Sequence, residues 1–377
     1  MKEVSQPKHR LIFEELRRQI AEGKYADGRR LPSEMEIAFR HAVSRPTAAR
    51  ALRDLQQLGV LERRAGSGTF LRPPQEPAAA RRVFGLLVPG LGNTEILDPI
   101  CNEITQFAQA RQSTVLWGDG AVNGTTTSDD ALRLCRHYVQ RKVAGVFFAP
   151  LETIADREAI NLQIVSELRA AGIAVVLLDR DMTEYPGRSD CDLVGIDNFG
   201  AGLILARHLI DSGKRRFVFV ARPMAPGTTD LRLAGCREAM ARAGITPAKN
   251  WIQYGDPGDQ RFVRNLLGKN SPDVIVCSND RTAAQLIQTL TQLAVHVPRD
   301  VGVTGFDDVR YATLLTTPLT TMRQPCRDIA KAAVAAMLER IESPDLYPRQ
   351  ILLSAELMVR QSCGENAPSA PAKKVQR

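Results

Sequence analysis

Short polar segments follow the apolar runs of this chain, and they carry side chains suited to holding a small polar molecule. The segments cover residues 90–93, 150–152, 179–181, 197–198, 279–280 and 307–308. Arginine, aspartate and asparagine in a partly buried cleft form paired, charge-assisted hydrogen bonds to vicinal hydroxyls, as sugar recognition requires. For Asn198 and Asp308, a helix cap or a surface turn is the favoured interpretation, because these are the usual positions of such residues.

Eight apolar runs of strand length alternate with helical patterns after residue 82. The runs cover residues 83–88, 114–117, 145–149, 173–178, 193–196, 217–221, 274–277 and 301–305. Strands that are apolar throughout and joined by helices predict an α/β fold with parallel sheets covered on both faces. About 280 residues exceed one doubly wound sheet, so we expect two lobes with a cleft between them. Ligands of such sheets bind beyond the carboxyl ends of the strands, where the polar segments lie.

The first 82 residues differ from the rest in charge. They hold 17 Lys and Arg against 10 Asp and Glu, in a chain of 377 residues with a net charge of +8. The remainder is therefore nearly neutral, and the basic segment predicts an anionic partner, most simply nucleic acid. Residues 72–82, RPPQEPAAARR, contain three prolines and no hydrophobic period. They predict a linker between two folding units.

A helix that could read DNA is predicted after Val43, with Ser44 as its N-cap. At 100° per residue, its apolar positions lie on one side and Arg50 and Arg53 on the other, with Arg45 in the first turn. Such a helix suits the major groove, where arginine donates two hydrogen bonds to guanine. An ordinary solvated helix face is the alternative.

The segments around this helix favour the DNA-reading interpretation. Phe13, Leu16 and Ile20 form an amphipathic stripe upstream, and Ser33 with Glu36 has the spacing of a capping box. Downstream, residues 60–64 and 69–71 read as strands around a basic, glycine-rich turn. Three helices and such a hairpin predict an N-terminal winged helix-turn-helix.

Composition excludes several other classes of protein. The longest apolar runs are far shorter than the roughly 18 residues of a membrane-spanning helix. The first residues lack the apolar segment of a secretory signal. The seven cysteines are odd in number and form no C-x-x-C pair, so a zinc site or a disulfide framework is not supported. We therefore expect a cytoplasmic protein with no metal, no cofactor and no membrane partner.

Residues 8–71 resemble the DNA-binding domain of the GntR family of bacterial regulators. The matching motifs are LPSE at residues 31–34, VSRPT at 43–47, ALRDL at 51–55 and GSGTF at 66–70. The resemblance implies that Arg45 reads a base, and that Ser44 and Thr47 hold phosphates. It also implies that the wing meets the minor groove. Further DNA contacts implied by it are Ser33, Glu34, Gly66, Ser67 and Arg50, the last standing one place later than the usual arginine of the family.

Residues 82 to about 362 resemble the effector domain of the LacI family, which is similar to type I periplasmic sugar-binding proteins. The motifs include VVLLDRD, LRLAGCREAMARAGI, PDVIVCSND and VPRDVGVTGFDD. The resemblance implies a two-lobed domain that binds a small-molecule effector, with Asp307 at the hinge between the lobes. The implied effector contacts are Asn93, Asp179, Arg180, Arg232 and Asp280. A GntR-type head on this body resembles the arabinose repressors, which implies a pentose or a related sugar.

Together these patterns predict a sequence-specific transcription repressor, controlled by a sugar that binds in the cleft between the lobes. We expect a homodimer on a palindromic operator. The expected domains are a DNA-binding domain at 1–74, a linker at 75–82, an effector domain at 83–363 and a disordered tail at 364–377.

Two other functions fit the α/β body less well. An enzyme would need a cofactor motif, but the Gly90-Leu91-Gly92 segment lacks the third glycine of a dinucleotide fingerprint, with Glu95 in its place. A solute-binding receptor would not need the winged head. Gel retardation with genomic fragments would distinguish the three.

Overall fold

The computed structural model describes residues 8–21, 31–57, 61–64, 68–71, 82–89, 95–118, 127–152, 154, 156–223 and 225–364. The chain divides into two compact units, Met1–Arg81 and Arg82–Arg377. Asn93, Gly66 and Ser67 lie outside the described residues, as do residues 72–81 of the linker and 365–377 of the predicted tail.

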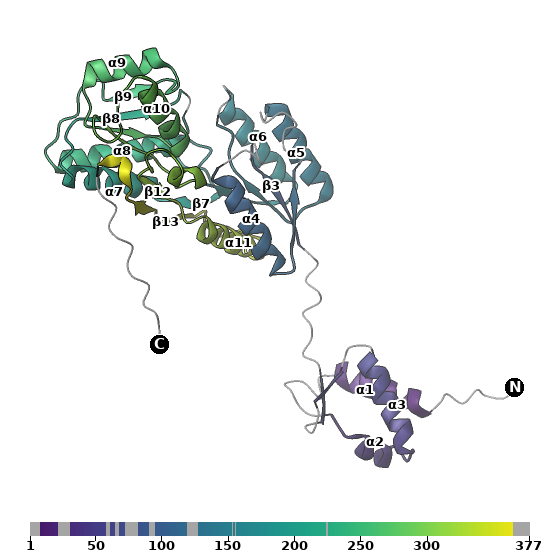
Figure 1. The fold of residues 1–377 in the computed structure, drawn as a ribbon. Helices are drawn as coiled ribbons and strands as arrows, with labels where there is room; N and C mark the ends of the chain where they lie inside the picture. The colour runs from purple at the N-terminus through teal and green to yellow at the C-terminus, as the bar shows by residue number, and fades with distance from the viewer. Residues whose placement is uncertain are drawn as a thin grey trace, which may run out of the picture. The chain divides into compact units, whose positions relative to one another are not determined.

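The smaller unit has three helices followed by a two-stranded hairpin (Figure 1). The elements are α1 (Lys8–Ala21), α2 (Glu34–Arg40), α3 (Arg45–Gln57), β1 (Leu61–Arg64) and β2 (Gly68–Leu71). The two strands pair antiparallel, with Leu61 opposite Leu71. This order is the winged helix-turn-helix that the sequence predicts.

One small core holds the three helices and the hairpin together. The stripe on α1 buries Leu16 as expected, and also Ile12, which the sequence pattern did not include. On α3 the apolar positions face inward while the three arginines stay exposed. The remaining buried members are Leu31, Ile37, Ala48, Ala51, Leu52, Leu55 and Leu61.

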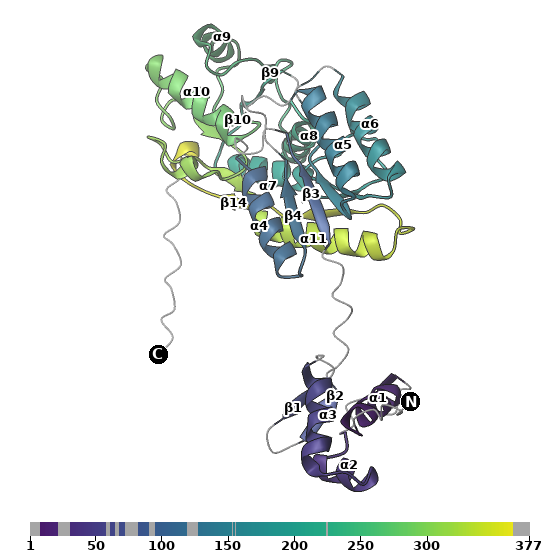
Figure 2. The ribbon, with the colours of Figure 1, turned by 90° about the vertical axis from the view of Figure 1, so that its right-hand side faces the viewer.

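The larger unit begins with a six-stranded sheet in the order β13-β7-β6-β5-β3-β4, and every neighbouring pair in it is parallel. Helices α4 (Leu97–Gln109) and α11 (Cys326–Glu342) pack on one face, and α5 (Ser128–Arg141) and α6 (Arg157–Ala170) on the other (Figures 1 and 2). We call this assembly lobe 1. Its strands are β3 (Val83–Leu87), β4 (Thr114–Trp117), β5 (Gly145–Phe148), β6 (Ala174–Leu178), β7 (Asp192–Ile196) and β13 (Gln350–Leu353).

A four-stranded sheet in the order β11-β10-β8-β9, also parallel, forms lobe 2. Helices α7 (Asn198–Asp211) and α8 (Gly227–Arg242) cover one face, and α9 (Gln260–Asn270) and α10 (Asp280–Gln292) the other. Its strands are β8 (Phe217–Ala221), β9 (Ile252–Tyr254), β10 (Val274–Cys277) and β11 (Gly302–Thr304).

Both sheets bury both of their faces, which explains their unbroken apolar runs. In β8, Phe217 and Phe219 belong to the core under α7 and α8, whereas Val218 and Val220 belong to the core under α9 and α10. The alternation follows from the two-residue period of a strand.

Three segments connect the lobes. The chain passes from β7 to α7, from β12 (Thr321–Arg323) to α11, and from β13 to β14 (Glu356–Met358). β12 and β14 pair antiparallel, so two of the connections support each other. Short helical turns, η1 (Arg310–Thr313) and η2 (Gln361–Cys363), complete the described unit. The parallel sheets and the two lobes agree with the predicted fold class.

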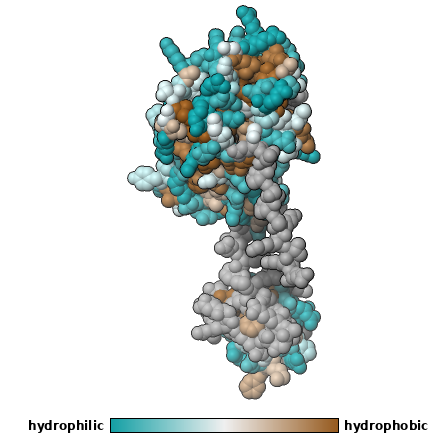
Figure 3. Space-filling model, turned by 60° about the vertical axis from the view of Figure 1, so that its left-hand side comes forward, coloured by the Kyte–Doolittle hydropathy of each residue, from teal (hydrophilic) through white to brown (hydrophobic). Residues whose placement is uncertain are grey.

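Four strands were not predicted from the sequence: β9, β12, β13 and β14. They have three or four residues each and lie at sheet edges or in the connecting pair. The side chains of β9, β13 and β14 are partly exposed, while β12 buries Thr321 and Met322 but is only three residues long. Such short strands form no continuous apolar run. On the face of the larger unit shown in Figure 3, hydrophobic side chains form patches among hydrophilic ones.

Candidate functional site

A cavity of about 590 Å³ lies between the two lobes. Lobe 1 contributes the ends of its strands and the start of α4, while lobe 2 contributes the starts of α8 and α10 and the segment after β11. The polar lining residues are Glu95, Glu152, Asp179, Arg180, Arg222, Thr228, Thr229, Arg232, Ser278, Asn279, Arg281, Thr282, Asp307 and Gln324. The structure thus brings together Asp179, Arg180 and Arg232, which the sequence predicts as site residues.

The backbone at the end of β6 fixes Asp179 and Arg180. The Asp179 amide donates to the carbonyl of Val194 at 2.9 Å, and the Arg180 amide donates to that of Leu178 at 2.8 Å. Asp179 has a φ of 69°, so the chain turns sharply there. Gly195 on the neighbouring strand makes room, since a Cβ there would lie 2.9 Å from the carbonyl oxygen of Asp179.

Arg180 is paired with two carboxylates on the same lobe. Its Nη1 lies 3.2 Å from Oδ2 of Asp179 and also contacts Glu152. Burial, and then the nearby Arg232, lower the pKa of Arg180. Burial raises the pKa of Asp179, against the opposite effect of Arg232. The Nε of Arg180 is buried and has no hydrogen-bond partner among the described residues.

Arg232 reaches the cavity from α8 and is held by the start of α7 and by the segments that follow β10 and β11. Its Nε donates to Oδ1 of Asn198 at 2.8 Å, and its Nη1 donates to the carbonyl of Ser278 at 2.7 Å. The guanidinium also lies 4.7 Å from the ring centre of Phe306. Gly202 lets α7 approach, because a Cβ there would overlap the carbonyl of Arg232. Arg232 is therefore a rigidly placed donor with only 5% of its surface exposed.

Asp307 faces Arg232 from the segment after β11. Its Oδ1 lies 3.6 Å from Nη2 of Arg232 and accepts a 2.8 Å hydrogen bond from Nε2 of Gln324. Burial raises the pKa of Asp307 to about 6, although Arg232 and Gln324 act to lower it. The sequence placed Asp307 at the hinge, and its amide does donate to the Met322 carbonyl at 2.8 Å, on the strand that leads to α11. Its carboxylate also lines the cavity. Gln324, on the connection to α11, was not predicted, and its Oε1 is buried with no partner in the described part of the chain.

Asp280 does not line the cavity, although the sequence predicts that it contacts the effector. Its side chain is fully buried, and it accepts hydrogen bonds from the Val309 amide at 3.0 Å and the Thr321 hydroxyl at 2.6 Å. Burial and Asp307 raise its pKa. Asp280 thus holds the segment that carries Asp307, and its neighbour Asn279 takes the place in the lining.

The cap and surface-turn interpretations of Asn198 and Asp308 were wrong. Asp197 caps α7, while Asn198 is buried and hydrogen-bonds to Arg232. The Asp308 side chain is also buried, and its two oxygens pair with Arg323 at 2.7 Å and Arg360 at 2.5 Å. Asn198 thus positions the lining residue Arg232, whereas Asp308 joins β12 to the segment before η2.

Three of the predicted DNA-binding residues, Ser44, Arg45 and Thr47, lie together at the start of α3. Nε of Arg45 lies 3.1 Å from Oε2 of Glu34 on α2, and the two hydroxyls of Ser44 and Thr47 are 2.8 Å apart. Arg50 is exposed one turn further along α3. Ser33 caps α2, since its hydroxyl accepts from the Glu36 amide while the Glu36 carboxylate accepts from the Ser33 amide.

The described part of the chain offers neither a metal site nor a membrane span. No group of three or more His, Cys, Asp or Glu side chains in that part of the chain could hold a metal ion. No helix there is long and apolar enough to cross a membrane.

A winged helix-turn-helix joined to a two-lobed α/β unit with a polar cavity defines a class of protein: transcription regulators that carry their own small-molecule sensor. Comparison with known proteins agrees. Residues 8–71 match the bacterial regulatory proteins of the gntR family, and residues 206–363 match a periplasmic binding protein-like domain.

Of the similar proteins, one covers nearly the whole chain and others cover its larger part. The ribose operon repressor of Escherichia coli is 33% identical over 243 residues, which are 63% of this chain and 71% of that protein. The arabinose metabolism transcriptional repressor of Geobacillus stearothermophilus is 26% identical over 97% of this chain and 100% of that protein. A LacI-family regulator from Sanguibacter keddieii has a solved structure with a TM-score of 0.58 and 27% identity, covering 75% of this chain and 100% of its own.

The chain belongs to the bacterial transcription repressors in which a gntR-family DNA-binding domain precedes a LacI-type, periplasmic-binding-protein-like domain. Because its relatives are repressors, the prediction of a regulator rather than an enzyme is confirmed.

Proposed function

We propose that this protein is a repressor that responds to a sugar, with residues 1–74 binding DNA and residues 83–363 binding the effector. The observation that carries the proposal is the cavity, where Arg180 and Asp179 of lobe 1 face Arg232 and Asp307 of lobe 2. Fixed donors and acceptors on opposite walls suit a ring of hydroxyls, each of which both donates and accepts. The function needs no cofactor.

The effector contacts we propose are Asp179, Arg180 and Arg232, together with Asp307 and Gln324. Asn93, outside the described residues, remains a prediction for the same site. Asp280 acts through the segment it holds rather than by touching the effector. A pentose is the first choice, because the relatives include repressors of ribose and arabinose metabolism.

On the DNA side, we propose that Arg45 reads a base and that Ser44 and Thr47 bind phosphates. Arg50 adds a contact on the same exposed side of α3, and Ser33 and Glu34 position the start of α2 beside it. Gly66 and Ser67 would place the wing. A regulator of this kind acts in the cytoplasm, where the chromosome is.

The proposed assembly is a homodimer on a palindromic operator, with half-sites about one helical turn apart. Closure of the two lobes around the effector would change the distance between the two DNA-binding domains. A ligand can do this only if its affinity differs between the open and closed states.

The experiment is gel retardation of genomic fragments by the purified full chain, repeated with pentoses, hexoses and polyols. We expect retention of particular fragments and a change of retention with one sugar. Equal retention of all fragments would contradict the DNA-binding proposal, and indifference to every sugar would contradict the effector proposal.

A further inference from the structure

The charges of the cavity lining cancel. Among the described lining residues there are four carboxylates, Glu95, Glu152, Asp179 and Asp307, and four arginines, Arg180, Arg222, Arg232 and Arg281. The two buried arginines each face a carboxylate, Arg180 beside Asp179 and Glu152, and Arg232 beside Asp307. Of the other two, Arg222 pairs with Asp256 at 3.2 Å, and Arg281 is exposed at the rim.

Two carboxylates contact Arg180, although one would be enough to balance its charge. Its Nη1 contacts both Glu152 and Asp179, whose side chains are only 22% and 12% exposed. Asp179 would by itself balance the charge of its neighbour. Glu152 therefore adds a carboxylate that makes this wall of the cavity net negative.

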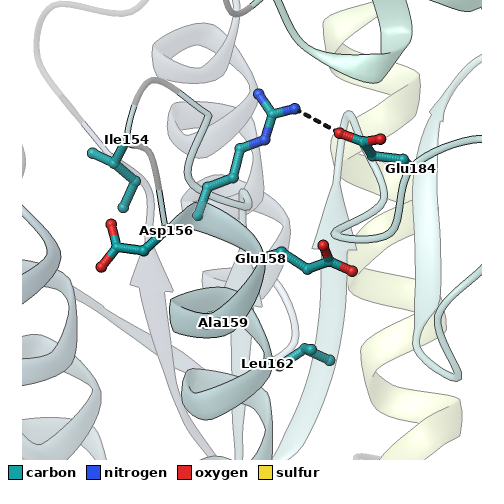
Figure 4. Close-up of a pocket in the computed structure, with 7 residues that line it drawn as sticks. Ile154, Asp156, Glu158, Ala159, Leu162 and Glu184 are labelled. Atoms are coloured by element: carbon teal, nitrogen blue, oxygen red, sulfur yellow. Dashed lines mark hydrogen bonds and ion pairs between the residues drawn. The ribbon is translucent and has the colours of Figure 1, made fainter.

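Side chains of α6 hold the backbone on either side of Glu152 and so position this residue. Asn161 holds the preceding residue, since its Oδ1 accepts from the Leu151 amide at 2.9 Å and its Nδ2 donates to the Leu151 carbonyl at 3.1 Å. Arg157 donates to the Glu152 carbonyl at 3.2 Å. Arg157 is in turn held by an ion pair of 2.9 Å with Glu184, marked by the dashed line in Figure 4. Glu152 is thus placed by its own segment rather than drawn in by Arg180 alone.

We propose that Glu152 is a specificity-determining residue that restricts the effector to uncharged carbohydrates. The inference rests on the proposed function, because it concerns the same cavity. With Glu152 and Asp179 beside it, Arg180 offers hydrogen-bond donors, including the unpartnered Nε, without a net positive charge. A carboxylate or phosphate ester on the ligand would meet the carboxylates of the lining and find no unpaired buried arginine there. Repulsion of like charge in a desolvated site is a strong means of rejecting a ligand.

The test is titration calorimetry of the full chain with matched neutral and anionic ligands: L-arabinose against D-galacturonate, which share a ring configuration, and D-ribose against D-ribose 5-phosphate. We expect the wild type to bind a neutral member and to bind its anionic counterpart at least about 100-fold more weakly. Glu152→Gln should reduce that ratio by about 10-fold or more, because it removes the excess charge but keeps the shape.

Two further variants separate charge from structure. Glu152→Asp keeps the charge and should keep the wild-type ratio, while Glu158→Gln removes an exposed carboxylate of α6 and should change nothing. Thermal unfolding of each variant checks the fold.

Three outcomes would overturn the inference. Tighter binding of an anionic ligand by the wild type contradicts it while leaving the proposed function intact. An unchanged ratio in a folded Glu152→Gln variant means that Glu152 does not determine specificity. If no carbohydrate, neutral or anionic, binds the wild type in this test or across the wider panel of pentoses, hexoses and polyols, the proposed function itself fails, and the inference fails with it.

Discussion

The hydroxyl of Tyr311 donates a 2.7 Å hydrogen bond to the carboxylate of Glu95, and this bond joins the two lobes. Glu95 precedes α4 in lobe 1 and lines the cavity, while Tyr311 lies in η1 of lobe 2. Burial and the bond to Glu95 raise the pKa of Tyr311, so the hydroxyl keeps its proton at neutral pH. The bond therefore stabilises the arrangement in which the lobes meet.

Tyr311→Phe should weaken effector binding without changing the cavity lining. Loss of a hydrogen bond worth ~1 kcal/mol would raise the effector Kd about fivefold by favouring separated lobes. Calorimetry on the full chain measures this change. Tyr347→Phe, at an exposed tyrosine of lobe 1, is the matched control. An unchanged Kd in Tyr311→Phe would mean that this bond has no part in closure.

Arg232→Ala should abolish effector binding and lower thermal stability. The change leaves Asp307 and Asn198 buried without their partner, and breaking such a buried pair costs about 3–5 kcal/mol. Arg232→Lys, which keeps the charge but not the two-pronged geometry, should bind the effector weakly while staying folded. Differential scanning fluorimetry with and without the sugar reports both effects. Arg237→Ala, at an exposed position on the same helix, should behave as wild type, and a normal ligand shift in Arg232→Lys would argue against Arg232 as a contact.

Effector affinity should fall as the pH drops through about 6, the pKa of Asp307. The ionised carboxylate accepts hydrogen bonds from hydroxyls, so binding favours that form and releases a proton. The groups that face this carboxylate are Arg232, Gln324, Asp179, Glu95 and Asp280. Asp307→Asn should flatten the dependence of Kd on pH between 5 and 8, and a profile with the same slope in both proteins would contradict this origin.

Protonation of Asp307 should weaken effector binding but should stabilise the folded state of the free protein. The pKa of this carboxyl is raised from an ordinary value of 3.8 to about 6, so the folded state binds the proton more tightly than the unfolded chain does. Its stabilising contribution is complete below pH 3.8 and is lost as the pH rises through 6. The difference in unfolding free energy between wild type and Asp307→Asn, measured across this interval, should change with that sign. A constant difference would exclude the shift.

Glu34→Gln should make DNA binding tighter and less selective. Glu34 pairs with Arg45 and repels phosphate, so its neutralisation should raise affinity for random DNA about three- to tenfold, the effect of ~1 kcal/mol of Coulomb energy.

Arg45→Ala should instead remove about 1–3 kcal/mol of discrimination between operator and random DNA. Fluorescence anisotropy at fixed salt measures both, with Glu14→Gln on α1 as control. Undiminished discrimination in Arg45→Ala would contradict its role.

Much of the fold could be predicted because both sheets are covered by helices on both faces. Every central strand therefore appears in the sequence as a run of apolar residues. The short edge strands could not, since a three-residue strand such as β9 leaves no such run. The head was predictable for a similar reason: the apolar side of α3 and the capping box of Ser33 are local signals.

The site was predictable only in part. The rule that ligands bind at strand ends led to Asp179 and Arg180, whose positions follow from the end of β6. It could not distinguish Asn279 from Asp280, because two adjacent residues at a helix start point in different directions, and only packing shows that Asp280 turns toward Val309 and Thr321. Gln324 follows a three-residue strand on a connection between the lobes, and no apolar run or motif in the sequence marks that position as part of a binding site.

The most direct test of coupling between cavity and head is the operator Kd measured by anisotropy, with and without a saturating concentration of the sugar that binds. In the wild type we expect the sugar to change this Kd by about 5- to 150-fold. In Arg232→Lys, at the same sugar concentration, the operator Kd should stay near its sugar-free value. An operator Kd that is indifferent to a sugar shown to fill the cavity of the wild type would contradict the coupling on which the proposed function depends.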